Sequence, residues 1–421
     1  MTNIRHHERI LLFITGVIML NGILAVSLTR GSVDYSVLGV TCGLMVAFMM
    51  VNIVLQKSGH TGDPLFLPVA ALLVSIGLTT ILRLKPNLFL AQSMWIGIGL
   101  IVFLFSVFIS RRLEEVTHYK YVCGFIGVSL LLIAILFGVD IGGHKSWVII
   151  GPMRFQPSEF AKVFIVLFLA AYLSERRELL TLATRHYGPF VLPHPRFIAP
   201  LIAVWSMAMM MFILQRDMGA ALLYFGIAMV MTYMVSGRFS YVMIGLILFL
   251  IGSVICYKLY GHIQTRVDIW LNPWGDPSGK AYQIVQSLFA FGSGGIMGSG
   301  LTYGFPSMIP EVHTDFIFAA IGEEMGFVGA GAVIIIYMIM VYRAFRSALL
   351  ATKPFSMLVA GGLAVSLALQ IFLIIGGVTK FFPLTGITLP FISYGGSSIV
   401  ANFILLGMLF TISEVRIYDG K

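Results

Sequence analysis

Residues that could do chemistry are gathered in a few polar segments of an otherwise apolar chain. The segment that ends at Asp315 stands out, because this carboxylate follows His313 and Thr314 directly before a long apolar run. A carboxylate at the boundary between water and an apolar helix is a candidate base for accepting a proton. The structural alternative is an N-cap or first-turn acid stabilised by the helix dipole. Thr314 could supply that cap instead, which would leave Asp315 available.

Basic residues in the polar segments are candidate ligands for phosphate groups. Arginine suits bidentate phosphate geometry, and lysine acts as a point charge. An ordinary solvated or snorkelling role is as reasonable for each one alone. The candidates are Lys145, Arg154, Arg216, Arg266, Lys280 and Lys380. Arg154, Arg266 and Lys380 rank first because they lie in or near the motifs quoted below.

Four charged residues fall inside apolar runs, where a charge is costly and usually pairs or lines a cavity. Glu159 and Lys162 are three residues apart, so they share one helix face. Glu323 and Glu324 follow Asp315 by about two helical turns, and the helical period directs them to different sides. Two interpretations stay open: a buried bridge from Lys162 to a glutamate that ties two helices, or a substrate cavity.

The elements that position these residues are membrane helices. Of the 421 residues, 58% are hydrophobic and 11% charged, against roughly 45–50% and 25% in soluble proteins. Apolar runs of about 20 residues span a bilayer. We predict an all-α polytopic membrane protein with twelve spans: 10–29, 36–55, 65–83, 88–109, 120–138, 158–175, 197–214, 218–236, 240–259, 315–342, 356–378 and 393–413. This composition excludes soluble enzyme folds and a nucleic-acid role inferred from the net charge of +9.

The distribution of lysine and arginine predicts that both termini are cytoplasmic, by the positive-inside rule. Two outer segments, 139–157 and 260–314, are then too long and too polar to be plain connectors, so the site is expected on the outer face. Two glycine pairs, Gly39 with Gly43 and Gly322 with Gly326, predict close helix packing.

Four blocks occur in a fixed order along the chain. The first is Trp147-Val-Ile-Ile-Gly-Pro-Met-Arg-Phe-Gln-Pro-Ser-Glu-Phe-Ala-Lys162, and the second is Tyr282-Gln283 followed by Ser287-Leu-Phe-Ala-Phe-Gly-Ser-Gly-Gly295. The third is Pro310-Glu-Val-His-Thr-Asp-Phe-Ile-Phe-Ala-Ala-Ile-Gly-Glu-Glu324, and the fourth is Pro383-Leu-Thr-Gly-Ile-Thr-Leu-Pro-Phe-Ile-Ser-Tyr-Gly-Gly-Ser-Ser398. Together they resemble the SEDS family (shape, elongation, division and sporulation), which includes FtsW, RodA and SpoVE.

The resemblance implies a ten-helix core over 65–421, including the outer loop 260–314, preceded by two extra helices in 1–64. It implies a glycosyltransferase of the bacterial cytoplasmic membrane that polymerises lipid II on the outer face. Asp315 matches the family's essential aspartate and is the expected general base. The expected partners are a class B penicillin-binding protein and other membrane proteins of the division or elongation complex. Residues expected near the substrate are Arg154, Arg266, Lys380, Lys145, His313, Glu311, Ser393 and Ser397.

The expected chemistry needs no organic cofactor. The diphosphate of a polyprenyl donor is a good leaving group, which needs positive charge or a divalent cation such as Mg²⁺ or Mn²⁺. Asp268 and Asp276 are acids that could help to hold such a cation, although no metal-binding motif is present. His313 either tunes Asp315 or caps the helix. The small residues from Ser393 to Ser398 would allow close packing or the approach of a lipid-linked substrate.

Two other functions compete with polymerisation. A flippase or transporter for a lipid-linked precursor would explain many helices with a few intramembrane charges. A non-catalytic scaffold for cell-wall enzymes is the third possibility. The outer-loop position of the polar residues and the presence of Asp315 favour the polymerase.

Overall fold

The computed structural model describes residues 2–31, 34–141, 144–151, 153–178, 184–187, 190–193, 206, 210, 214–215 and 217–414. The chain divides into two compact units. The first contains residues 1–111, 269–346 and 370–421, and the second contains residues 112–268 and 347–369.

Helices account for both units, apart from a few short strands. Helices that lie wholly or mainly in the first unit are α1 (Thr2–Thr29), α2 (Tyr35–Lys57), α3 (Phe66–Leu84), η1 (Pro86–Leu88), α4 (Phe89–Ile109), η3 (Pro273–Gly275), α12 (Tyr282–Gly294), η4 (Pro306–Met308), α13 (Ile317–Leu350) and α15 (Gly396–Ile412). Those wholly or mainly in the second unit are η2 (Ser110–Tyr119), α5 (Lys120–Phe137), α6 (Pro157–Glu175), α9 (Met218–Ser236), α10 (Phe239–Leu259), α11 (Gly261–Leu271) and α14 (Pro354–Val378).

Hydropathy located the membrane helices well. Nine helical segments in the described part are long and apolar enough to span a membrane, and one of these, Pro86–Phe137, contains both α4 and α5. The helix Gly396–Ile412 is apolar but shorter. Eleven of the twelve predicted spans therefore coincide with helices, although α1 begins as early as Thr2 and α13 runs on to Leu350. The predicted span 197–214 falls almost wholly outside the described residues.

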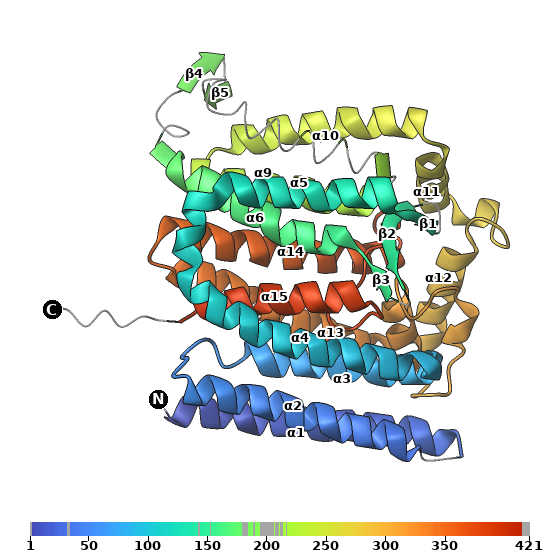
Figure 1. Ribbon diagram of the computed structural model, residues 1–421. Coiled ribbons are helices and arrows are strands. Elements are labelled where there is room, and N and C mark those ends of the chain that lie inside the picture. The colour runs from blue at the N-terminus through green and yellow to red at the C-terminus, as the bar shows by residue number, and fades with distance from the viewer. Residues whose placement is uncertain are drawn as a thin grey trace. The chain divides into compact units, whose positions relative to one another are not determined.

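In the first unit, α15 packs along α4 (Figure 1). Phe103 of α4 lies between Phe403 and Phe410 of α15, with ring centroids 6.5 and 5.8 Å apart. Gly99 makes this approach possible, since a Cβ there would lie 2.3 Å from the Phe403 ring. All three phenylalanines are fully buried, so this contact fixes α15 against α4.

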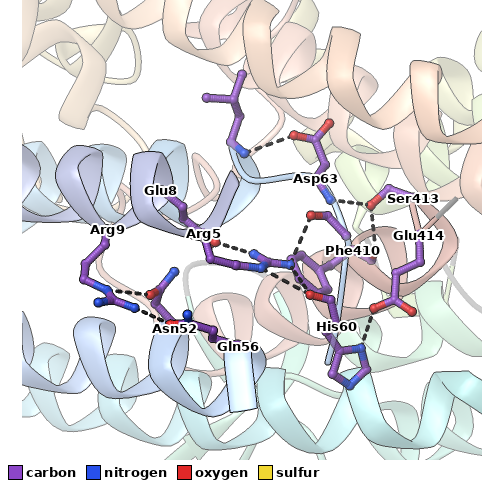
Figure 2. A network of polar contacts seen from close by, with 12 residues as sticks. Arg5, Glu8, Arg9, Asn52, Gln56, His60, Asp63, Phe410, Ser413 and Glu414 are labelled. Atoms are coloured by element: carbon purple, nitrogen blue, oxygen red, sulfur yellow. Dashed lines mark hydrogen bonds and ion pairs between the residues drawn. The ribbon is translucent and has the colours of Figure 1, made fainter. Parts of the chain in front are cut away.

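The N-terminal helices α1 and α2 lie side by side, and α1 packs against α3 (Figure 1). Figure 2 shows the polar network at one end of this contact, where Arg5 of α1 donates to the carbonyl oxygens of His60 and Gly62 at 3.1 Å. Arg5 also pairs with Glu8, and its guanidinium lies over the Phe410 ring. Both charged side chains are buried, so the pair compensates a burial that would be costly for either alone.

In the second unit, the buried helix α6 contacts α5 and α9. Gly124 and Gly127 of α5 leave room for Phe168 and Ile165 of α6. The Tyr224 hydroxyl of α9 donates to the Ser158 carbonyl oxygen at 2.7 Å. By contrast, Cys256 is the one buried residue of α10, as expected for a helix that faces lipid.

The predicted all-helical membrane fold is confirmed, and the connecting segments add a few short strands that the sequence did not predict. Strands β1 (Val139–Ile141), β2 (His144–Ile150) and β3 (Met153–Phe155) form an antiparallel sheet, and β4 (Thr184–Tyr187) pairs with β5 (Phe190–Pro193). The segment 260–314 is also more than a loop, because it contains α11 and α12. These elements are too short for hydropathy to reveal them.

The two glycine pairs have different outcomes. Gly39 and Gly43 have open space where a Cβ would lie, so the prediction of close packing within the chain was wrong there. Gly322 does pack closely, since its Cβ would lie 2.5 Å from the Phe291 ring of α12. Gly326 instead interrupts α13, with φ +66°.

Candidate functional site

Asp315 lies in a turn two residues before α13 begins, and its side chain is half-buried. The backbone of this turn is held by the segment that precedes α15. The Ser393 hydroxyl donates to the Thr314 carbonyl oxygen at 2.6 Å. The Tyr394 amide donates to the His313 carbonyl oxygen at 2.9 Å. The two peptide carbonyls just before Asp315 are therefore fixed by two consecutive residues of the fourth motif.

Ser393 is itself held from two sides. Its hydroxyl accepts the Leu389 amide at 2.9 Å, which closes a turn around the left-handed residue Phe391. Gln92 of α4 donates to the Ser393 carbonyl oxygen and accepts the Gly395 amide, both at 3.2 Å. Helix α15 thus begins at Gly396, so the prediction that it begins at Ser393 was wrong. The three residues before α15, Ser393 to Gly395, form a backbone clamp that holds the Asp315 turn.

A second layer of buried polar contacts supports this clamp. The Thr388 hydroxyl donates to the Ser398 hydroxyl at 2.7 Å, and Asn402 donates to the same oxygen at 3.2 Å. Gln370 donates to the Thr388 carbonyl oxygen at 3.0 Å, and the Tyr337 hydroxyl donates to the Pro390 carbonyl oxygen at 2.6 Å. Ser397, which we predicted near the substrate, is also buried. Such a network restricts the rotamers of the residues that it joins.

His313 and Glu311 lie on the same turn as Asp315. The His313 ring is buried and lies 5.8 Å from the Tyr394 ring, centroid to centroid. Its Nε2 is 3.7 Å from the exposed Glu311 carboxylate. Burial lowers the pKa of His313 below its usual 6.5; the Glu311 carboxylate acts in the opposite direction and the Lys85 ammonium adds to the decrease. His313 is therefore mainly neutral near pH 7.

Glu323 and Glu324 of α13 both have hydrogen-bonding partners within the first unit. Glu324 pairs with Arg83 of α3 at 3.1 Å, and the Glu323 carboxylate accepts the Phe305 amide at 2.7 Å. Both side chains are buried. Glu323 holds the segment 299–305 directly, and Glu324 holds it through Arg83; that the two glutamates point to different sides relative to Asp315 stays a prediction.

The charged pair of α6 lies in the second unit. Lys162 donates to Glu159 at 2.7 Å, one turn away on the same helix, and both are buried. Their predicted position on one helix face is confirmed. Lys162 thus pairs with the glutamate one turn before it on its own helix.

The predicted phosphate-binding residues are distributed over both units. Lys380 is in the first unit, in left-handed conformation, and its carbonyl oxygen accepts the Trp270 indole at 3.2 Å. Exposed Lys145 and Arg154 lie on β2 and β3, and Arg266 lies on α11, all in the second unit. Lys280 is exposed in the first unit, and Arg216 lies outside the described residues.

The two loop acids are engaged separately. Asp268 accepts the Tyr257 hydroxyl at 3.3 Å, and Asp276 accepts the Lys280 amide at 3.0 Å. Within the described ranges, no three His, Cys, Asp or Glu side chains come together as a metal-binding group.

Sequence reasoning missed Gln92 and Arg83, which the structure connects to the site. A polar residue within an apolar run was the available signal for Gln92, and an arginine at the end of a span was the signal for Arg83. Neither residue lies in one of the four motif blocks, and their partners are more than 200 positions away in sequence.

Comparisons with known proteins agree on one family. The sequence model of the FtsW/RodA/SpoVE family, described as "Cell cycle protein", matches residues 70–417. The chain is 37% identical to peptidoglycan glycosyltransferase RodA of Mycobacterium tuberculosis, over 97% of this chain and 90% of that protein. It is 32% identical to stage V sporulation protein E of Bacillus subtilis, over 85% and 98%.

The fold has a counterpart among solved structures. A structure described as "Structural coordination of polymerization and crosslinking by a peptidoglycan synthase complex" superposes with TM-score 0.71 at 27% identity. It covers 85% of this chain and 99% of the matched one.

Proposed function

The chain belongs to the FtsW/RodA/SpoVE (SEDS) family and is a peptidoglycan glycosyltransferase of the bacterial cell envelope, a multi-pass membrane protein, and we propose that it polymerises lipid II with Asp315 as general base. Lipid II is a disaccharide-peptide carried on a polyprenyl diphosphate. The proposed reaction takes place at the outer face of the cytoplasmic membrane, with both termini in the cytoplasm.

The reaction that we propose requires one proton acceptor. A sugar hydroxyl of one glycan attacks the anomeric carbon of another, a C–O bond forms, and the bond to the diphosphate breaks with inversion. The Asp315 carboxylate accepts the proton of the attacking hydroxyl. The diphosphate leaves as an anion and needs no acid partner of the kind that glycosidases supply. It needs positive charge.

The observation that carries the assignment is the clamp on the Asp315 turn. Ser393 and Tyr394 hold the two carbonyls that precede Asp315, so the backbone that carries the carboxylate is held by a largely buried network. A base must be held to within about 0.5 Å of its productive position. Asp315 is also half-buried next to a helix N-terminus, where a carboxylate is favourably placed.

Positive charge for the diphosphate comes in this proposal from Lys380, Arg154, Arg266 and Lys145, with Glu311, His313, Ser393 and Ser397 close to the sugar-binding region. A divalent cation such as Mg²⁺ or Mn²⁺ would add charge at the leaving group. The described acids do not form a ready-made site for it, so such a cation would need oxygen ligands from the diphosphate as well.

We also propose a class B penicillin-binding protein, a transpeptidase, as partner, within a larger division or elongation complex. The likeness to a chain from a peptidoglycan synthase complex that coordinates polymerisation and crosslinking supports this proposal.

A second candidate function is the transport of a lipid-linked precursor. The break of α13 at Gly326 favours it, because discontinuous helices are common at transporter binding sites.

One experiment separates the two functions. Purified protein is reconstituted into liposomes with fluorescent lipid II, with and without the transpeptidase and Mg²⁺ or Mn²⁺. The polymerase produces muramidase-sensitive glycan chains. Precursor that crosses the bilayer without chain formation would contradict polymerisation and support transport.

A further inference from the structure

A short helical rod follows Asp315. Helix α13 begins at Ile317 and breaks at Gly326, whose φ of +66° and ψ of −169° are accessible in practice only to glycine. The break is filled by the segment 295–300. Ser299 and Gly300 donate their amides to the carbonyl oxygens of Glu323 and Glu324 at 2.9 and 3.0 Å.

The contacts continue on the other side of the break. Phe327 and Val328 donate their amides to the carbonyl oxygens of Gly295 and Ile296 at 2.9 and 3.1 Å. The backbone groups freed by the break are thus satisfied by the segment 295–300. Residues 317–325 form a separate rod whose far end is fixed to that segment, while its near end carries Asp315.

Arg83, at the end of α3, holds the rod and the segment together. Its Nε donates to the Glu324 carboxylate at 3.1 Å, and its Nη2 donates to the carbonyl oxygens of Thr302 and Gly304 at 3.3 and 3.0 Å. Glu324 is buried. A planar guanidinium can reach three acceptors in fixed directions, which a lysine ammonium does less well. One side chain therefore connects α3, the rod and the segment 299–305.

An arginine that follows helix α1 holds the backbone at Arg83. Arg30, just after α1, donates to the carbonyl oxygens of Leu82 and Arg83 at 2.6 and 3.1 Å, which satisfies the last carbonyls of α3. At the other end of α1, Arg5 donates to the carbonyl oxygens of His60 and Gly62 (Figure 2). The two arginines hold the backbone just before α3 and in its last turn. Both lie outside residues 70–417, which match the family.

We propose that Arg83 is a positioning residue for glycosyl transfer, which fixes the Asp315 rod against the segment 299–305, and that Arg30 of the N-terminal helix holds Arg83 in place. The inference rests on the proposed role of Asp315. A base displaced by about 1 Å loses on the order of 100-fold in rate, so loss of this anchor reduces turnover more than substrate binding.

The test uses the full chain in lipid II-containing liposomes, and it measures kcat, KM and the melting temperature. For R83Q we expect kcat to fall about 10- to 100-fold with KM within about two-fold. R83K retains part of the activity, and E324Q, which keeps an acceptor oxygen, loses less than R83Q. R30Q has a smaller effect, and the double variant R30Q/R83Q is no slower than R83Q because the two residues act in series.

R5Q is the matched control, because Arg5 is the corresponding arginine at the opposite end of α1. It lowers the melting temperature but leaves kcat per folded molecule unchanged. Should R83Q fail to fold, R83K and E324Q carry the test. A rise in KM at constant kcat would assign Arg83 to substrate binding, and losses equal to those of R5Q would make it purely structural. Either result overturns the proposal, as do fully additive effects of R30Q and R83Q.

Asp315→Asn in the same assay separates this proposal from the one on which it rests. If that variant polymerises at the wild-type rate, the base assignment fails whatever Arg83 does. If it is inactive while R83Q and R83K keep wild-type kcat, only the positioning role fails.

Discussion

Ser393 and Thr314 are 79 positions apart in sequence, yet the hydroxyl of the first donates to the carbonyl oxygen of the second at 2.6 Å. Because Asp315 follows Thr314, this bond connects the third and fourth motifs at the point where the proposed base leaves the backbone. The relationship gives the fourth motif a concrete role. Its small residues form a turn that fits against the Asp315 segment, and its backbone groups have defined partners.

Ser393→Ala removes this donor and also the acceptor of the Leu389 amide. The Leu389 amide is buried and the Thr314 carbonyl is partly buried, and an unsatisfied buried group costs about 1–3 kcal/mol. We expect a lower melting temperature together with a lower kcat, because the Asp315 turn loses its anchor. Thermal unfolding in detergent and lipid II turnover measure the two effects.

Ser287→Ala is the control for this variant. Ser287 is equally buried, and its hydroxyl donates to the carbonyl oxygens of Ile284 and Val378 at 2.8 and 3.1 Å. Loss of stability with normal turnover is expected there. Equal turnover in the two variants would contradict the clamp.

Gly326→Ala is expected to destabilise the protein strongly. A Cβ at this position would lie 2.2 Å from the Gly298 nitrogen and 2.5 Å from the Ile296 oxygen, and the conformation alone costs about 1–3 kcal/mol for other residues. Gly331→Ala, in the same helix with open space around it, should be neutral or gain up to about 1 kcal/mol from helix propensity. Melting temperatures compare the two variants, and similar values would show that the break is not required.

The neutral state of His313 predicts a pH dependence of stability. Since burial lowers its pKa below 6.5 in the folded protein, the unfolded chain binds the proton more tightly. The stability that the neutral His313 ring gives the folded protein is therefore fully present above pH 6.5, and it is lost as the pH falls below that value. The melting temperature of the His313→Gln variant should therefore fall less between pH 7.5 and pH 5.5 than that of the wild-type protein. An identical pH profile in the variant would refute this contribution.

Arg266→Ala tests the proposed diphosphate contact on α11. We expect weaker use of lipid II, seen as a higher KM, with a smaller effect on melting temperature, because a lost phosphate contact affects substrate binding directly. A binding titration with lipid II measures it. Unchanged affinity would remove Arg266 from the site.

Much of the fold could be predicted because each apolar run of about 20 residues reports its own helix. The helix break at Gly326 could not, since it depends on backbone bonds to the segment 295–300. The short strands and α12 were missed because hydropathy does not resolve elements of their length. Asp315, His313 and Ser393 were identified through motifs. Arg83 and Gln92 were not, because their role lies in partners that only the folded chain brings near.

The most direct test of the account is polymerisation by Asp315→Asn. This variant replaces the carboxylate by an amide of nearly the same shape, so we expect normal membrane insertion and a melting temperature close to wild type. With fluorescent lipid II, wild-type protein should produce muramidase-sensitive glycan chains and the variant should produce none. Full-length chains from a folded Asp315→Asn protein would contradict the central claim that Asp315 accepts the proton.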